Sequence, residues 1–180
     1  MSVDKLQEKI RKLKNPSMVD FAVDFTQIPP YIMEEEHSEI LAYERFVKEL
    51  LDAFKGIVPA VRFNMGQFSM VGPDGLFLMS RLTQYAKNLE YYILLDVPEC
   101  FSAQAAEQVT RNLFKEHCIY EFDGIAVSAY AGSDVLKPYL KAIKDNAKDV
   151  FVVLRTANKS AAELQDLLTG SRLVQRRNVS

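Results

Sequence analysis

The stretch that decides the fold is Tyr91-Tyr-Ile-Leu-Leu-Asp96-Val-Pro98-Glu99-Cys100-Phe101-Ser102. Its first five residues are apolar or aromatic and predict a buried strand that ends at a carboxylate, Asp96. Pro98 ends the strand, because proline cannot donate to a strand ladder. Ser102 is the expected N-cap of a run of helix formers that begins at Ala103. This order of strand, acid, short loop and helix is typical of βα folds, whose functional groups lie at the carboxyl ends of the strands.

The same alternation of strand and helix runs along the whole chain. Further strands are predicted at 18–24, 57–62, 123–128 and 149–155. Helices are predicted at 4–13, 38–55, 76–87, 102–117, 133–144 and 160–170. Strands joined by helical crossovers lie parallel, so the pattern predicts an α/β fold with about five parallel strands. A single (β/α) domain, 1–180, is expected, with an irregular tail at 171–180.

The composition narrows the class of protein. The 180 residues are 48% hydrophobic, enough for one core, and the net charge is −2. This charge gives no bulk attraction to nucleic acid or anionic lipid, so neither is expected as a partner. No apolar run reaches the roughly 18 residues of a membrane span, and the first residues do not form a signal peptide. Cys100 and Cys118 do not have the spacing of metal ligands, and a single pair of cysteines cannot define a disulfide framework. This favours a cytoplasmic protein.

The strand ends resemble those of one enzyme family. In order they read Val58-Pro-Ala-Val-Arg62-Phe-Asn64, Gly72-Pro-Asp-Gly75, Leu95-Asp96, Gly124-Ile-Ala-Val-Ser-Ala-Tyr130-Ala-Gly132-Ser-Asp134 and Phe151-Val-Val-Leu-Arg-Thr156-Ala-Asn158-Lys-Ser160. Together they are similar to the orotidine 5′-monophosphate decarboxylase family, in its longer bacterial branch, from about residue 10 to the last helix. The resemblance implies a TIM-barrel-like (β/α) fold and a homodimer with sites at its interface. It also implies decarboxylation of orotidylate to uridylate, in pyrimidine biosynthesis, with no cofactor and no metal.

The resemblance also implies roles for individual residues. Asp24 falls at the family's first-strand aspartate, a ribose contact, and Arg62 falls where the family has its first lysine. Asp96 matches the first aspartate of the family's Asp-x-Lys-x-x-Asp motif. Asp96 and Arg62 are therefore the expected catalytic residues. Asp24, Thr156 and Asn158 are the expected substrate-binding residues, and the ligand implied is a pyrimidine nucleotide monophosphate.

The sequence departs from the family at the residues that perform the reaction. The lysine of the motif is Pro98 here, its second aspartate is Phe101, and the serine between Thr156 and Asn158 is Ala157. Proline offers no proton and phenylalanine no charge, and an arginine is a poor proton donor because its pKa is above about 12. We therefore predict weak or no decarboxylase activity, which would make the chain a pseudoenzyme.

The number of strands is a second departure. The family's phosphate-binding site follows strands seven and eight, as in many barrels, whereas the pattern here predicts about five strands. Five parallel strands cannot close the barrel, so we expect an incomplete barrel with two open edges. Either the chain is a shortened product or another surface covers an edge. The alternative function is therefore a non-catalytic interaction module that pairs through an open edge with itself or with a barrel partner.

Simpler interpretations of the same residues remain open. Asp24 and Asp96 could be strand-terminal acids that cap loop amides. Arg62 could pair with both acids as a structural ion pair, an interpretation as well supported as a functional one. Cys100 is most simply an inert thiol. Arg155 could bind a phosphate or form a salt bridge within its loop.

Overall fold

The computed structural model of the protein describes residues 2–167, and the predicted tail at 171–180 lies outside them. One sheet has the strand order β1-β2-β3-β4-β5, and every neighbouring pair is parallel. The strands are β1 (Met18–Phe21), β2 (Ala60–Asn64), β3 (Tyr92–Asp96), β4 (Gly124–Ser128) and β5 (Asp149–Val153). The sheet stays open between β1 and β5 in the described residues, which confirms the predicted incomplete barrel.

Helices follow the strands as the crossover pattern requires. The α-helices are α1 (Ser2–Leu13), α2 (Pro30–Glu35), α3 (Glu39–Phe54), α4 (Met65–Met70), α5 (Pro73–Asn88), α6 (Ala103–Leu113) and α7 (Ser133–Asn146). Two short 3₁₀ helices are η1 (Phe25–Gln27) and η2 (Lys159–Glu163). No helix within residues 2–167 has the length and hydropathy needed to cross a membrane.

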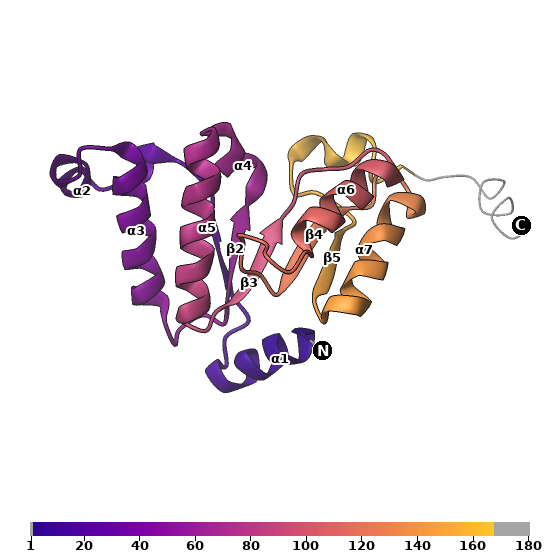
Figure 1. Ribbon diagram of the computed structural model, residues 1–180, viewed down its shortest axis with the longest axis horizontal. Coiled ribbons are helices and arrows are strands. Elements are labelled where there is room, and N and C mark those ends of the chain that lie inside the picture. The colour runs from indigo at the N-terminus through magenta and orange to yellow at the C-terminus, as the bar shows by residue number, and fades with distance from the viewer. Residues whose placement is uncertain (1, 168–180) are drawn as a thin grey trace, which may run out of the picture.

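The long helices cover one face of the sheet, so most of the core lies between that face and the helices (Figure 1). Alternate residues of a strand point to opposite faces, and those that face the helices are buried and apolar. From the central strands they are Val61, Phe63, Ile93, Leu95, Ile125 and Val127, and from the helices they include Val47, Leu51, Leu78, Leu82, Val135 and Tyr139. This packing leaves the opposite face for polar residues near the carboxyl ends of the strands.

Helix α1 lies at the amino ends of the strands, apart from the other helices (Figure 1). Its Leu6 packs with Ala60 and Tyr92, on the face of the sheet that the other helices leave uncovered. The Tyr92 hydroxyl donates a 2.6 Å hydrogen bond to Asp149, and its ring meets Phe151 edge-on. Helix α1 therefore covers this face of the sheet at the amino ends of the strands, while the face stays accessible at the carboxyl ends of the strands.

Most predicted elements are confirmed, with shorter strands than expected. Two short helices, α2 and α4, were not predicted, because each spans only a single turn or two. The stretch Gly72–Gly75 is the start of α5 and not a free turn, because Gly72 (φ +85°) precedes Pro73 at the first helical position.

The last predicted helix, 160–170, is wrong where the structure describes it: only the 3₁₀ helix η2 forms, and 168–170 lie outside the described residues. The side chain of Gln165 bonds Thr156 twice, and Asp166 pairs with Arg155. These contacts turn the segment back onto the loop after β5, so it does not continue as a helix.

The close approach of α4 and α5 depends on Gly75. A Cβ atom at this position would lie 2.1 Å from the Phe68 carbonyl oxygen and 2.7 Å from the Val71 Cβ. We expect Gly75→Ala to lower the free energy of unfolding by about 3 kcal/mol, because the backbone must move to admit the methyl group. At Gly66, a Cβ would meet only the Asn64 side chain, at 3.2 Å. The matched control Gly66→Ala should therefore stay within about 1 kcal/mol of the parent. Equal urea midpoints for the two variants would contradict this packing argument.

Candidate active site at the carboxyl ends of the strands

Strand register brings four polar residues together at the carboxyl end of the sheet. Asp20 lies opposite Arg62, and Asn64 lies opposite Asp96. Arg62 and Asn64 are two residues apart and so point to the same face, opposite the buried Phe63 between them. We refer to Asp20, Arg62, Asn64 and Asp96 as the strand-end cluster.

Arg62 is the centre of the strand-end cluster. One guanidinium nitrogen, Nη1, donates to Asp20 Oδ2 at 3.1 Å, and the other, Nη2, donates to Asp96 Oδ2. The Asn64 Nδ2 donates to the same Asp96 oxygen at 3.0 Å. The Arg62 side chain is 33% exposed and that of Asp96 21%, so the pair is neither fully solvated nor buried. Asp96 and Arg62, the two expected catalytic residues, are thus in direct contact.

The pKa of Asp20 reflects both its partial burial and the charges of the strand-end cluster. Partial burial raises the pKa of this carboxyl group, Arg62 acts to lower it, and the negative charge of Asp96 acts to raise it. The cluster contains two carboxylates and one guanidinium, so one cation serves two acids. A positively charged or hydrogen-bond-donating group of a ligand would therefore be favoured beside Asp20.

Asp24 lies outside the strand-end cluster. Its carboxylate caps η1, accepting hydrogen bonds from the Thr26 amide at 3.0 Å, the Thr26 hydroxyl at 2.6 Å and the Gln27 side chain at 3.0 Å. The hydrogen bonds from Thr26 lower the pKa of Asp24. The interpretation that Arg62 pairs with Asp24 is wrong: Arg62 pairs with Asp20, because Asp20 is in register on β1 and Asp24 lies beyond the end of that strand.

Tyr43 holds in place the segment that joins Asp20 and Asp24. Its hydroxyl donates to the Ala22 carbonyl oxygen at 2.6 Å, and the residue is 3% exposed. Burial raises the pKa of Tyr43, and the charges of Asp20 and Asp24 add to this effect. The phenol therefore acts as a neutral donor that positions the backbone of both acids.

Thr156 and Asn158 lie in the loop after β5, on exposed backbone. The Thr156 amide donates to Gln165 Oε1 at 2.7 Å, and Gln165 Nε2 donates to the Thr156 hydroxyl at 2.8 Å. Arg155 forms a two-pronged ion pair with Asp166 at 2.8 and 2.9 Å, the salt bridge that was one of its two open interpretations. No hydrogen bond or ion pair in residues 2–167 links this loop to the strand-end cluster.

The loop after β3 carries the two positions, Pro98 and Phe101, at which we expect a departure from the resembling family. Pro98 and Phe101 are both exposed, and Phe101 reaches 73% exposure. Cys100, between them, is half-buried, and its Sγ lies 3.3 Å from the Tyr139 hydroxyl of α7. This contact anchors the loop to the helical layer and supports the interpretation of Cys100 as a structural thiol.

The rest of the described surface offers no metal centre. No group of three or more histidine, cysteine or acidic side chains within residues 2–167 has the arrangement to hold a metal ion.

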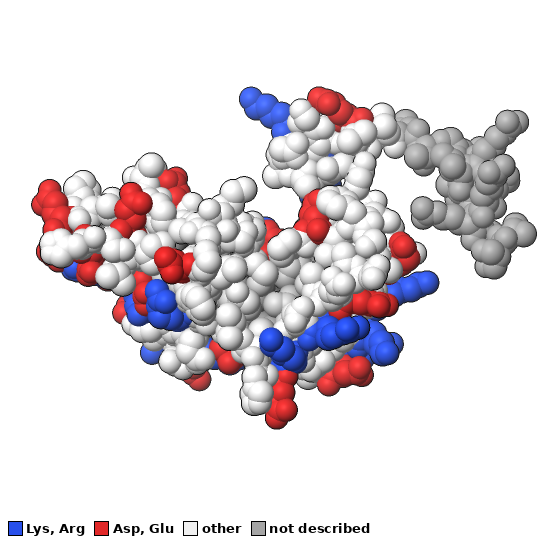
Figure 2. All heavy atoms as spheres, turned by 45° about the horizontal axis from the view of Figure 1, so that its top comes forward, with Lys and Arg blue, Asp and Glu red and all other residues white. Residues whose placement is uncertain are grey.

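The visible face in Figure 2 carries acidic and basic side chains in both halves, with wide uncharged areas between them.

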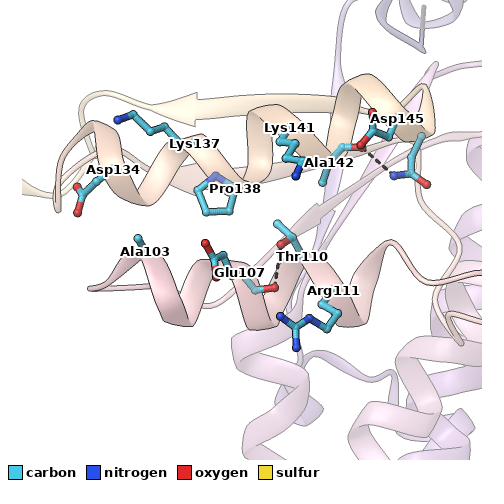
Figure 3. A pocket seen from close by; sticks show the side chains of 11 residues that line it. Ala103, Glu107, Thr110, Arg111, Asp134, Lys137, Pro138, Lys141, Ala142 and Asp145 are labelled. Atoms are coloured by element: carbon cyan, nitrogen blue, oxygen red, sulfur yellow. Dashed lines mark hydrogen bonds between the residues drawn. The ribbon is translucent and has the colours of Figure 1, made fainter.

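A groove of about 660 Å³ runs between α6 and α7, away from the strand-end cluster. Its lining includes Glu107 and Arg111 of α6 and Lys137 and Lys141 of α7 (Figure 3). With both signs of charge distributed along it, the groove has no net preference for an anion or a cation.

Two residues of the strand-end cluster, Asp20 and Asn64, were not predicted from the sequence. The alternation of side chains along a strand could have indicated Asn64, because it follows Arg62 by two residues and therefore points to the same face of the sheet. For Asp20 the signal is weaker, since its partner depends on the register between β1 and β2.

The fold and the site together define an α/β protein with an open parallel sheet and a charged cluster at the strand ends. No family model matches the chain. Among curated proteins it is 27% identical over 172 residues to orotidine 5′-phosphate decarboxylase of Clostridium kluyveri, covering 94% of this chain and 57% of that one. It is 25% identical over 181 residues to the same-named protein of Caldicellulosiruptor bescii, covering 92% and 59%. The chain is thus similar to orotidine 5′-phosphate decarboxylases over nearly all of its length, and the resemblance noted in its sequence is confirmed.

Solved structures show the same fold. The OMP decarboxylase of Leishmania donovani superposes with a TM-score of 0.71 at 23% identity, covering 94% of this chain and 60% of that one. The enzyme of Plasmodium berghei gives a TM-score of 0.73 at 13% identity, covering 93% and 65%. The chain therefore has the fold of part of these proteins, and it spans less than three-fifths of the curated relatives above.

Removing Arg62 should destabilise the chain in a pH-dependent way. Arg62→Met leaves Asp20 and Asp96 close together without their shared cation. We expect the free energy of unfolding to fall by about 1 kcal/mol at pH 7, the upper range for partly exposed pairs. The attraction requires an ionised Asp20, whose pKa is raised by burial, so the difference should shrink as the pH falls through this raised pKa. Urea unfolding at pH 7 and pH 3 measures both effects. A difference that grows on acidification would contradict the assignment.

Proposed function

We propose that this chain is an orotidine 5′-phosphate decarboxylase-like protein of pyrimidine (UMP) biosynthesis that binds a pyrimidine nucleotide monophosphate and has weak or no decarboxylase activity. The strand-end cluster is the observation that supports this proposal. It holds Asp96 against a fixed cation, Arg62, at the end of the sheet where barrel enzymes place their chemistry. The relatives are named for the decarboxylase, and we extend the pathway and the ligand class from them to this chain, but not full activity.

The proposed lack of activity follows from the chemistry of decarboxylation. When carbon dioxide leaves, the electron pair stays on the pyrimidine carbon, which must then receive a proton. Fixed charges aimed at the developing charge lower the barrier. Arg62 can supply such a charge, but its guanidinium is a poor proton donor and already donates to two carboxylates.

The substituted loop supports the same conclusion. Pro98 and Phe101 stand where the resembling family has a lysine and a second aspartate, and neither can donate a proton or carry charge. Asp96 makes its only ion pair within residues 2–167 with Arg62. A site of this kind can orient a ligand through Asp96, Asn64 and Arg62 without protonating it. The proposal includes a cytoplasmic homodimer, on the basis of the family resemblance.

Isothermal calorimetry with uridylate and with orotidylate tests the ligand class. We expect saturable heat with a defined stoichiometry for at least one nucleotide, and a loss of at least tenfold in affinity in Asp96→Ala, because a charge-assisted contact is worth about 1.5–3 kcal/mol. Arg45→Met is the matched control, since Arg45 pairs with Glu35 and Glu49 outside the site. No heat from a cooperatively folded sample would contradict nucleotide binding. Orotidylate turnover that disappears in Asp96→Ala would contradict the proposed lack of activity.

An interaction module is a second candidate function, supported by the surface of β5. This strand has a neighbour on one side only in the described residues. Val152, Val153 and Leu154 are 37%, 38% and 82% exposed. Leu164 and Leu167, 65% and 63% exposed, add to the apolar surface after the strand. An exposed apolar edge strand is a template for pairing with another chain.

Sedimentation velocity tests edge pairing. If β5 pairs with a second copy, the parent chain sediments as a dimer and Val153→Lys shifts it to the monomer, because lysine on an edge opposes pairing. Met18 on the other edge strand provides the matched control, Met18→Lys, for a dimer formed through β5. A stable monomeric parent would leave edge pairing without support. A dimer that survives Val153→Lys would point to another interface.

A further inference from the structure

A second large cavity lies in the helical layer, distinct from the strand-end cluster. Its volume is about 670 Å³, within the range of sites for small molecules. One wall is α6, and the others are the start of α4, the loop after β3 and the segment that follows α6. Neither Arg62 nor Asp96 lines it. On its other side, α6 packs against α7.

Sulfur atoms are concentrated on the walls of this cavity. Both cysteines of the chain, Cys100 and Cys118, line it together with Met65. Both thiols are free and half-buried, and Cys100 is held in place by its contact with the buried Tyr139. Thioether and thiol groups are polarizable and pack favourably against aromatic rings. The walls therefore favour an aromatic occupant over an aliphatic one.

Helix α6 supplies the remaining chemistry of the cavity. Residues at helical spacing on one face line it, namely Ala105, Gln108, Val109, Asn112 and Leu113. Beyond the carboxyl end of the helix, Lys115 adds a cation that forms no ion pair in residues 2–167. The acid Glu99 lies in the loop that precedes α6, towards the opposite end of the helix. The Asn112 amide donates to the Gln108 carbonyl oxygen at 2.9 Å, so Lys115 and the Gln108 side chain are the donors that this wall offers to an anion.

We propose that this cavity is a binding site for a small aromatic carboxylate. The ring packs among Met65, Cys100 and Val109, and the carboxylate lies near Lys115 and Gln108. The site is independent of the proposed nucleotide site. The two sites adjoin in the sequence, since Met65 follows Asn64 directly and Pro98 lies two residues after Asp96.

Titration with 2-naphthoate, combined with iodoacetamide labelling of the two cysteines, tests the proposal. At ten times its dissociation constant, 2-naphthoate should slow labelling of Cys100 and Cys118 about elevenfold, in proportion to the remaining free protein. Neutral 2-naphthol has the same rings without the charge and should bind several-fold more weakly. Labelling rates unchanged by saturating 2-naphthoate would overturn the proposal.

Paired variants locate the binding. Ala105→Trp fills this cavity and should abolish 2-naphthoate binding, whereas Ala142→Trp, in the α6–α7 groove, should leave it unchanged (Figure 3). Lys115→Met should weaken binding about two- to fivefold, the range for an exposed ion pair, and Lys141→Met should have no effect. If Ala105→Trp does not fold, the comparison of Lys115→Met with Lys141→Met still tests whether 2-naphthoate binds in this cavity. Equal affinities in the lysine pair, or binding retained in a folded Ala105→Trp, would overturn the proposal.

One further variant separates this inference from the proposed function. Arg62→Met removes the cation of the strand-end cluster and should leave 2-naphthoate binding unchanged. Loss of binding in this variant would place the carboxylate at the strand ends and overturn the second site. Failure of uridylate binding, in contrast, would leave the result for 2-naphthoate unaffected.

Discussion

The contact between Arg62 and its two carboxylates organises the functional end of this protein. It joins three adjacent strands, because Asp20, Arg62 and Asp96 come from β1, β2 and β3. A guanidinium is suited to this role, since its planar fork can donate to two acids at once. These two contacts use two of the five N–H groups of the guanidinium. A ligand acceptor could therefore bind the remaining N–H groups of Arg62 without displacing Asp20 or Asp96.

The open sheet explains why the two faces of the molecule differ so strongly. Helices bury the apolar residues of one face, and α1 closes only the amino-terminal end of the other. In a closed barrel, the second face would be filled by side chains from the remaining strands. Here it carries a charged cluster at one end, and the edge strand β5 exposes apolar side chains. Both candidate functions arise from this arrangement, one from the charges and the other from the edge.

The proposed loss of activity concerns proton transfer more than binding. A site can keep a fixed charge when lysine is replaced by arginine, but it cannot keep a proton donor whose pKa suits neutral pH. In this chain Asn64 donates a hydrogen bond to Asp96, which also pairs with Arg62. This geometry supports the proposed recognition of a pyrimidine nucleotide without efficient chemistry, and the cavity beside α6 is the proposed second binding site.

The sequence by itself determined the parallel α/β fold, the order of its long helices and strands, and the positions of Arg62 and Asp96 at strand ends. These features follow from local periodicity, N-caps and strand-breaking prolines such as Pro98. Only the tertiary structure decided that Asp20, and not Asp24, pairs with Arg62, because that choice depends on register between strands distant in sequence. The 3₁₀ helix η2, formed where a longer helix was predicted, and the cavity beside α6 likewise depend on contacts between segments that are separated in the sequence. Local patterns carry no information about such contacts.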